Sequence, residues 1–284
     1  MKCLSALCFL LSTLAVSAQP FTFNDVAFVG SLTAPEASAV AVDMFYDGEG
    51  TPDATVTLTA MTNQCHAVTV GTFASDNGDP NTNTTFRAAA QLGTLRNSVL
   101  CNGTTYTGAG STGFRMSQEF LATTQIAQTL AANQAAIQFG CFVRYNGSGL
   151  FTTQTSPITI QQVTSGYGGV QGKADGLPVF SLRAHGSVTP NVGANITAAT
   201  QTVYWVQGVI RKTVGVEIGV YSYPAFACLG YSSNGVSATD INVIQFPRIA
   251  NGAIGVYTID CDNLVLNWTS PCASGGAITN TPWP

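Results

Sequence analysis

The sequence predicts a mainly β protein, built as two packed β-sandwich-like halves with one helix in the N-terminal half. Three observations support this fold class. Apolar residues alternate with threonine and serine over many short segments, glycine and Asn/Asp clusters separate those segments, and an even number of cysteines remains after a leader is removed. Charged residues make up 8% of the chain and hydrophobic residues 45%, so the chain can bury a core although Thr, Ser, Asn, Gly and Gln supply most of its polarity.

Residues 1–18 are predicted to be a secretory signal peptide. Lys2 supplies the positive start, residues 4–16 form an apolar run too short to cross a bilayer, and Val16-Ser17-Ala18 resembles a cleavage site. No later apolar stretch is long enough to span a membrane, and basic residues adjoin only at Arg211-Lys212. We therefore expect a secreted, extracellular protein without a membrane span and without a nucleic-acid partner.

The strands are predicted from two-residue periodicity. In residues 54–61, Val56, Leu58 and Ala60 alternate with threonines, which is typical of a half-buried strand. The same alternation predicts further strands over residues 66–73, 156–163, 202–209, 214–223, 241–246, 253–259 and 264–268.

Residues 137–145 are expected to form another strand, with Cys141 anchoring it and Arg144 facing solvent. Asn146-Gly147 is expected to make the turn that ends it. The inward-facing side chains are predicted to be Ile137, Phe139, Cys141, Val143 and Tyr145.

The predicted helix covers residues 116–132, where Ser117 can cap the start. Its apolar face would consist of Met116, Phe120, Ala127, Leu130 and Ala131. A glycine-rich stretch over residues 164–178 has no apolar periodicity and is predicted to be a linker. The expected organisation is a β-rich domain with one helix over 19–163, that linker, and a β-rich domain over 179–284.

The cysteines are predicted to form three disulfides in an oxidising compartment. The six that follow the leader are Cys65, Cys101, Cys141, Cys228, Cys261 and Cys272. Of the fifteen pairings that six cysteines allow, sequence spacing favours Cys65–Cys101 and Cys228–Cys261 within the halves, and Cys141–Cys272 between them. The chain has only His66 and His185 and no paired metal-ligand spacing, so no catalytic thiol, metal site or cofactor is predicted.

Asparagine sequons give the second expected modification. N-x-S/T triplets occur at Asn83, Asn102, Asn146, Asn195 and Asn267. In an exported chain they are acceptors for N-linked glycans, which would keep a charge-poor surface soluble.

Three motifs invite a functional interpretation. Gly108-Ala-Gly110-Ser-Thr-Gly113 matches G-x-G-x-x-G, but no buried strand precedes it and no acid follows at the required distance, so a loop is the expected structure. Residues 256–261 resemble a stretch late in pepsin-like aspartic proteases, but the two active-site turns of those enzymes do not occur. A last group of acids is expected to form a solvated turn, with calcium binding as the alternative: Asp43, Asp47, Glu49 and Asp53.

The expected function is non-enzymatic, because no catalytic set is recognised. The chain is predicted to be a secreted, disulfide-stabilised glycoprotein with a structural or coat role, whose partners are extracellular proteins or glycans. A carbohydrate-binding module is the first alternative, if Tyr204, Trp205, Tyr221 and Tyr223 form an exposed platform rather than a core stripe. A secreted hydrolase with paired carboxylates is the second, if two acids converge in a cleft.

Overall fold

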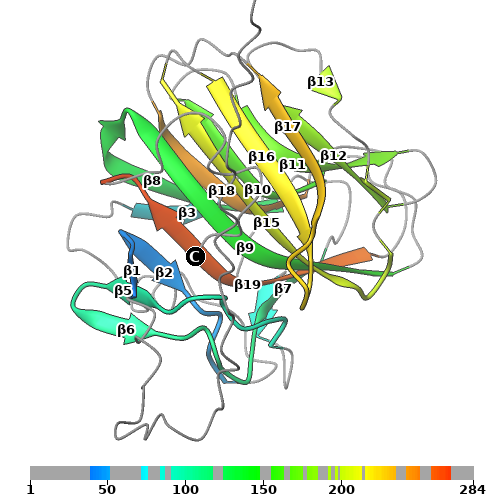
Figure 1. Cartoon of the computed structure of the whole chain (residues 1–284), viewed down its shortest axis with the longest axis horizontal. Helices are drawn as coiled ribbons and strands as arrows, with labels where there is room; N and C mark the ends of the chain where they lie inside the picture. The colour runs from blue at the N-terminus through cyan, green and yellow to red at the C-terminus, as the bar shows by residue number, and fades with distance from the viewer. Residues whose placement is uncertain are drawn as a thin grey trace, which may run out of the picture. The chain divides into compact units, whose positions relative to one another are not determined.

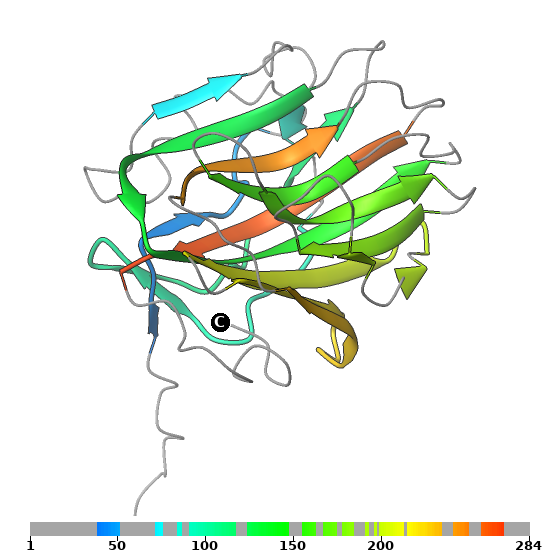
Figure 2. The same ribbon diagram turned by 90° about the horizontal axis from the view of Figure 1, so that it is seen from above.

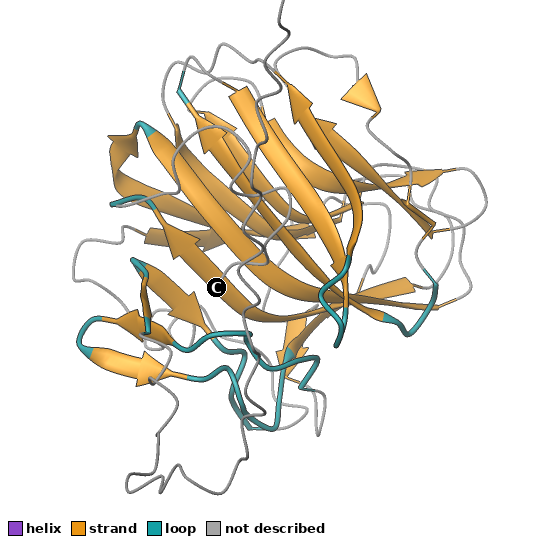
Figure 3. Cartoon of the chain, viewed as in Figure 1, coloured by secondary structure: helices purple, strands orange, loops and turns teal. Residues whose placement is uncertain are grey.

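The computed structural model describes residues 39–51, 72–75, 84–86, 91–117, 124–147, 155–162, 167–174, 178–184, 191–192, 196–197, 199–212, 215–234, 241–249 and 257–269. Residues 37–284 form one compact unit. The regular elements of the described residues are all β-strands (Figure 3), which confirms the mainly β prediction. No helix able to cross a membrane occurs in this part of the chain. The leader and the predicted strand over 54–61 lie outside the described residues.

The strands form three sheets. The small sheet has the order β1-β5-β6, and one eight-stranded sheet, called here the central sheet, has the order β17-β16-β15-β9-β19-β7-β4, with β2 paired to β19. The bounds are β1 Val40–Ala41, β5 Val99–Cys101 and β6 Thr104–Tyr106 in the small sheet. In the central sheet they are β2 Met44–Tyr46, β4 Thr84–Phe86, β7 Phe114–Ser117, β9 Ala136–Gly147, β15 Val203–Arg211, β16 Gly215–Ser222, β17 Cys228–Asn234 and β19 Tyr257–Asn267.

The third sheet, called here the outer sheet, has the order β13-β12-β11-β10-β18-β8-β3, with β14 paired to β12. Its strands are β3 Thr72–Ser75, β8 Thr124–Gln134, β10 Thr155–Gln162, β11 Tyr167–Ala174, β12 Pro178–Ala184, β13 Asn191–Val192, β14 Ile196–Thr197 and β18 Ile241–Ile249. The two eight-stranded sheets overlie each other in Figures 1 and 2, and β12 of the outer sheet contacts β16 and β17 of the central sheet.

Both eight-stranded sheets combine strands from before and after residues 164–178. β8 pairs with β18 in the outer sheet, and β9 pairs with β15 and β19 in the central sheet. β11 itself lies within the range predicted as a linker. Strands from the two predicted halves therefore share their main-chain hydrogen bonds.

The predicted helix over 116–132 is wrong where the structure describes it. Its first residues belong to β7, and residues 124–134 form β8. β8 pairs with β3 on one side and β18 on the other, with irregular register along β18. Alanine, glutamine and leucine favour a helix by intrinsic propensity, so hydrogen bonding to two neighbouring strands overrides the local preference of this segment.

The central sheet is covered on both faces, and β9 is buried through its middle. The face with Phe139, Cys141, Val143 and Tyr145 is buried as predicted. The opposite face also carries a buried aromatic ring, Phe142. On that second face, residues of the small sheet and of the 91–95 segment complete one hydrophobic cluster with β2, β9, β15, β16 and β19; its members are Val42, Phe45, Leu92, Leu95, Val99, Cys101, Phe142, Trp205, Tyr221 and Val265.

β19 joins two segments that the sequence predicts as separate strands, 253–259 and 264–268. The register with β9 shifts between Asp262 and Val265, where Asn263 has a φ of 50°. This bulge accommodates the Asp-Asn pair without ending the strand. It also ends the pairing with β7 and leads to the pairing with β2, so β19 organises the site described next.

Candidate functional site

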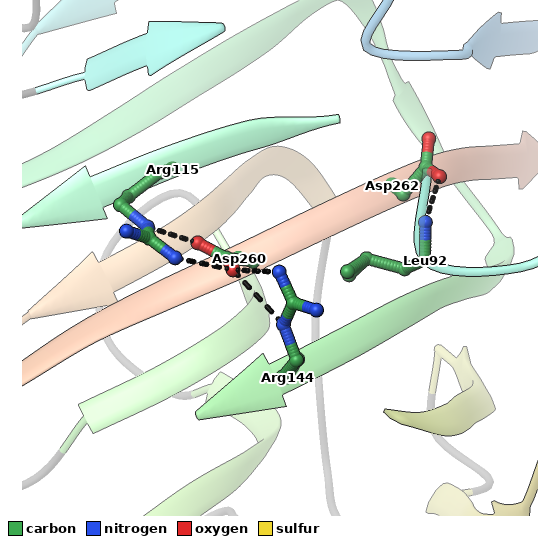
Figure 4. A network of polar contacts seen from close by, with 5 residues as sticks. All are labelled: Leu92, Arg115, Arg144, Asp260 and Asp262. Carbon is green, nitrogen blue, oxygen red and sulfur yellow. Dashed lines mark hydrogen bonds and ion pairs between the residues drawn. The ribbon is translucent and has the colours of Figure 1, made fainter. Parts of the chain in front are cut away.

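Three charged residues lie at one register position across three neighbouring strands. Asp260 of β19 is opposite Arg115 of β7 on one side and Arg144 of β9 on the other. Because directly opposed residues in a sheet point to the same face, both guanidinium groups lie beside one carboxylate. Figure 4 shows the arginines on either side of Asp260. Arg144 was predicted to face solvent; it lies on the face opposite Cys141, but only 24% of its side chain is exposed and its guanidinium group is bound to this buried acid.

The three side chains form a compact ion-pair cluster, called here the Arg–Asp–Arg cluster. Arg115 donates from Nε to Oδ1 and from Nη2 to Oδ2, the latter over 2.8 Å. Arg144 donates from Nε and Nη2 to Oδ2, over 3.0 and 2.6 Å. The Asp260 side chain is only 1% exposed, whereas those of Arg115 and Arg144 are 21% and 24% exposed. Two positive charges and one negative charge leave this cluster with a net charge of +1.

Asp262 lies two residues further along the same face of β19 in a different environment. Its carboxylate is buried and accepts the backbone N–H groups of Leu92 and Asn263, each over 2.8 Å. Burial raises the pKa of Asp262 well above its usual value, although the two N–H donors oppose the shift. The bond to Leu92 ties the 91–95 segment to β19 (Figure 4).

Asn263, in the bulge of β19, extends this link to a second loop. Its Nδ2 donates to the carbonyl groups of Gly93 and Gly108, over 2.8 and 2.9 Å. The bulge residue therefore joins the segment at 91–95 to the start of the glycine motif at 108–113.

The glycine motif holds a carboxylate of the chain itself. Backbone N–H groups of Ser111 and Thr112 donate to Oε1 of Glu49, over 2.7 and 3.0 Å. At Gly110, a Cβ atom would lie 1.7 Å from the same oxygen, so this position needs glycine for the carboxylate to approach. The prediction of a loop without a nucleotide role is consistent with this contact, because the loop amides already bind an anionic side chain.

The other acids of the suggested calcium cluster have separate partners. Asp43 accepts the backbone N–H groups of Trp268 and Thr269. Asp47 accepts the N–H group of Glu49, and burial is the main cause that raises its pKa. Asp53 lies outside the described residues. Within the described ranges no three His, Cys, Asp or Glu side chains are placed to hold a metal ion.

The cysteines differ from the predicted pairing. Cys141 and Cys261 are buried free thiols, and Cys228 is an exposed free thiol, so the bonds Cys228–Cys261 and Cys141–Cys272 are not formed in this structure. Cys141 and Cys261 lie on adjacent strands, where burial raises the pKa of both thiols. Cys101 takes part in a disulfide, and its predicted partner Cys65 lies outside the described residues. Spacing along the chain could not reveal that β16, β15 and β9 lie between Cys228 on β17 and Cys261 on β19.

The suggested aromatic platform is mostly core. Tyr204, Trp205 and Tyr221 are buried, and only Tyr223 is partly exposed. The indole N–H group of Trp205 donates to Gln207 Oε1 over 2.8 Å, which satisfies its polar atom inside the cluster. Burial of these rings favours the core stripe over a flat sugar-stacking surface.

Two predicted glycan acceptors have described side chains. Asn102 is exposed in the turn between β5 and β6, with a φ of 49°. Asn267 is buried in β19, and its Nδ2, the atom that would carry a glycan, donates to the carbonyl group of Ala41 over 3.3 Å. Asn146 lies in β9, and Asn83 and Asn195 lie outside the described residues. Glycosylation itself stays a prediction.

Comparisons with known proteins give distant likenesses only. No protein-family profile matches the chain, and no curated protein matches it in sequence. A bifunctional GH43-CE protein of Bacteroides eggerthii is similar in structure at 15% identity and a TM-score of 0.39, over 55% of this chain and 21% of that one. The chain thus spans about a fifth of that protein's length.

Two further structures are similar over nearly their whole length. A protein of unknown function from Shewanella oneidensis MR-1 has 10% identity and a TM-score of 0.41, over 79% of this chain and 100% of that one. Lectin II from Ulex europaeus has 6% identity and a TM-score of 0.38, over 69% of this chain and 98% of that one. At these values the function must be argued from the residues of this chain.

Proposed function

We propose that this protein is a secreted, disulfide-stabilised glycoprotein with a non-enzymatic structural or coat role, acting through contacts with glycans or other extracellular proteins. One observation carries the proposal: the acidic side chains that the structure describes are held by donors of the chain itself. These acids are Asp43, Asp47, Glu49, Glu217, Asp260 and Asp262. Carboxylates bound by donors of the same chain hold strands and loops in place, which is the role expected of acids in a structural protein.

The same contacts argue against the hydrolase alternative at β19. Asp260 and Asp262 lie on one face at a separation of roughly 7 Å along the strand, a spacing at which paired carboxylates can act on a glycosidic bond. However, both oxygens of Asp260 accept from arginines, and both oxygens of Asp262 accept backbone N–H groups. Since both side chains are also buried, a substrate could reach neither carboxylate without loss of these bonds.

Localisation of the intact protein tests the proposal. We expect the chain without residues 1–18 to be recovered outside the cell, associated with insoluble extracellular material. Its association should survive replacement of Asp262 by Asn, because no acid–base step is involved. Recovery of the chain from the cytosol with its leader attached would contradict the proposal. Hydrolysis of a polysaccharide that is abolished in Asp262→Asn, while the fold is retained, would contradict it as well.

A further inference from the structure

We infer that the Arg–Asp–Arg cluster binds a carboxylate group of an acidic polysaccharide, an inference that rests on the proposed role in glycan contacts. The cluster is made by Arg115, Asp260 and Arg144 at one register position of the central sheet. Its ligand would be a uronic acid unit, recognised by the guanidinium groups that Asp260 holds in place.

Charge and exposure support an anion at this position. Each guanidinium uses its Nε and Nη2 atoms on Asp260. Among the described residues, the Nη1 atom of neither arginine has a hydrogen-bond partner. About a fifth of each arginine side chain is exposed, at 21% for Arg115 and 24% for Arg144. A ligand can therefore reach donors that carry an excess of one positive charge, while the buried acid remains covered.

The geometry is prepared before the ligand binds. An isolated surface arginine loses much side-chain freedom when it binds an anion, which reduces the affinity. Here Arg115 and Arg144 are both fixed through two donors to the same carboxylate, as Figure 4 shows. Planar guanidinium groups suit the planar carboxylate of a uronic acid, which can accept parallel N–H bonds.

The surrounding sequence favours a sugar over an acidic peptide. The chain is poor in charge, with 8% charged residues, so it offers few further cations for a polypeptide with repeated acids. One excess positive charge in a chain whose polarity comes mostly from uncharged residues matches one uronic acid within a chain of hydroxyl-rich rings.

Binding to polygalacturonate tests the inference, with the deglycosylated protein used because Asn146 belongs to a predicted sequon. We expect binding that free galacturonate competes and that about 0.5 M salt weakens, since the ion pair is part-exposed. Arg144→Gln and Arg115→Gln should each weaken binding about ten-fold, the usual scale for a charge-assisted hydrogen bond. Arg211→Gln is the matched control, because Arg211 is also ion-paired on the central sheet, with Glu217.

Asp260→Asn tests the preorganisation. It raises the net charge of the cluster to +2 but removes the carboxylate that holds both guanidinium groups, so the variant should bind polygalacturonate more weakly, by a few fold, provided that circular dichroism shows a retained fold. A merely structural cluster would show lower stability and no change in affinity. Arg144→Lys is a milder variant that keeps the positive charge but loses the paired N–H donors of the guanidinium group. Its affinity should lie between those of the parent and Arg144→Gln.

Several results would overturn the inference. These are equal losses in Arg144→Gln and Arg211→Gln, unchanged or tighter binding by folded Asp260→Asn, or tighter binding of polyglutamate or of a sulfated polysaccharide than of polygalacturonate. Retention on neutral polysaccharide or extracellular material without preference for polygalacturonate would overturn this inference and leave the proposed function standing. Recovery from the cytosol with the leader attached would contradict the proposed function, whatever the polymer preference of the purified chain.

Discussion

Replacement of Gly110 by alanine is expected to displace Glu49 from the loop at 108–113. The new Cβ atom would lie 1.7 Å from Glu49 Oε1, far inside any allowed contact. Because Glu49 is a flexible side chain, its carboxylate should move and the backbone should stay in place. The N–H groups of Ser111 and Thr112 would then lose the acceptor that they now share.

The structure sets the size of this effect. Glu49 Oε1 accepts two backbone N–H groups, over 2.7 and 3.0 Å. Hydrogen bonds to charged groups contribute about 1.5–3 kcal/mol each, and solvent near this part-exposed carboxylate reduces the pair to about 2 kcal/mol. The added methyl group restricts the unfolded chain and returns about 0.5 kcal/mol. Gly110→Ala should therefore lower the free energy of unfolding by about 1.5 kcal/mol.

Urea unfolding of Gly110→Ala, Glu49→Ala and the double variant measures this coupling, with circular dichroism as the signal. Once Glu49 is truncated, the clash disappears, so Gly110→Ala should be neutral or slightly stabilising in that background. Gly103→Ala is the control: nothing lies within 4 Å of its Cβ position, and its cost arises from a φ of +78°. That cost should add to the cost of Glu49→Ala. Additive costs for Gly110→Ala and Glu49→Ala would refute the reasoning.

Three further predictions follow from buried groups. Gly140→Ala should lower the free energy of unfolding by about 2–3 kcal/mol, because its Cβ atom would lie 2.3 Å from an indole ring that cannot move aside; an unchanged melting temperature would contradict this. Iodoacetamide with peptide mapping should label Cys228 in the native protein, but Cys141 and Cys261 only in denaturant, because burial removes access and raises the pKa of both thiols. The raised pKa of the Asp262 carboxyl means that its contribution to stability is fully present below its unfolded pKa and is lost as the pH rises toward the folded value. The free energy of unfolding of Asp262→Asn should therefore rise relative to that of the parent between acid and neutral pH. If urea titrations showed a constant difference between the two proteins across that range, the raised pKa of Asp262 would be wrong.

Alternation along the chain predicted the strands of the central sheet well. The predicted segments 202–209 and 214–223 correspond to β15 and β16, and the pattern at 137–145 identified one buried face of β9. A two-residue period is a local property of a half-buried strand, so it can be read from sequence. The prediction of a helix over 116–132 was wrong because its residue types favour a helix locally, whereas pairing with two strands distant in sequence determines the structure.

The candidate site could not be predicted in the same way. Arg115, Arg144 and Asp260 are far apart in the chain and share no motif, and only the register of β7, β19 and β9 brings them together. The one sequence signal for the Arg–Asp–Arg cluster was that single charged residues occur within apolar strand segments of a charge-poor chain. The contact between Glu49 and Ser111 is likewise a tertiary one, in a loop that Asn263 in the bulge of β19 binds at Gly108.

By itself, the sequence determined that this protein is a β-strand protein with a sizeable core and a surface poor in charge, since periodicity and composition act over neighbouring residues. The tertiary structure alone decided which strand covers which face, where the thiols lie and which cations meet Asp260. The reason is that sheet register and ion pairing are contacts between residues distant in sequence, whose energies depend on a geometry that no local pattern encodes.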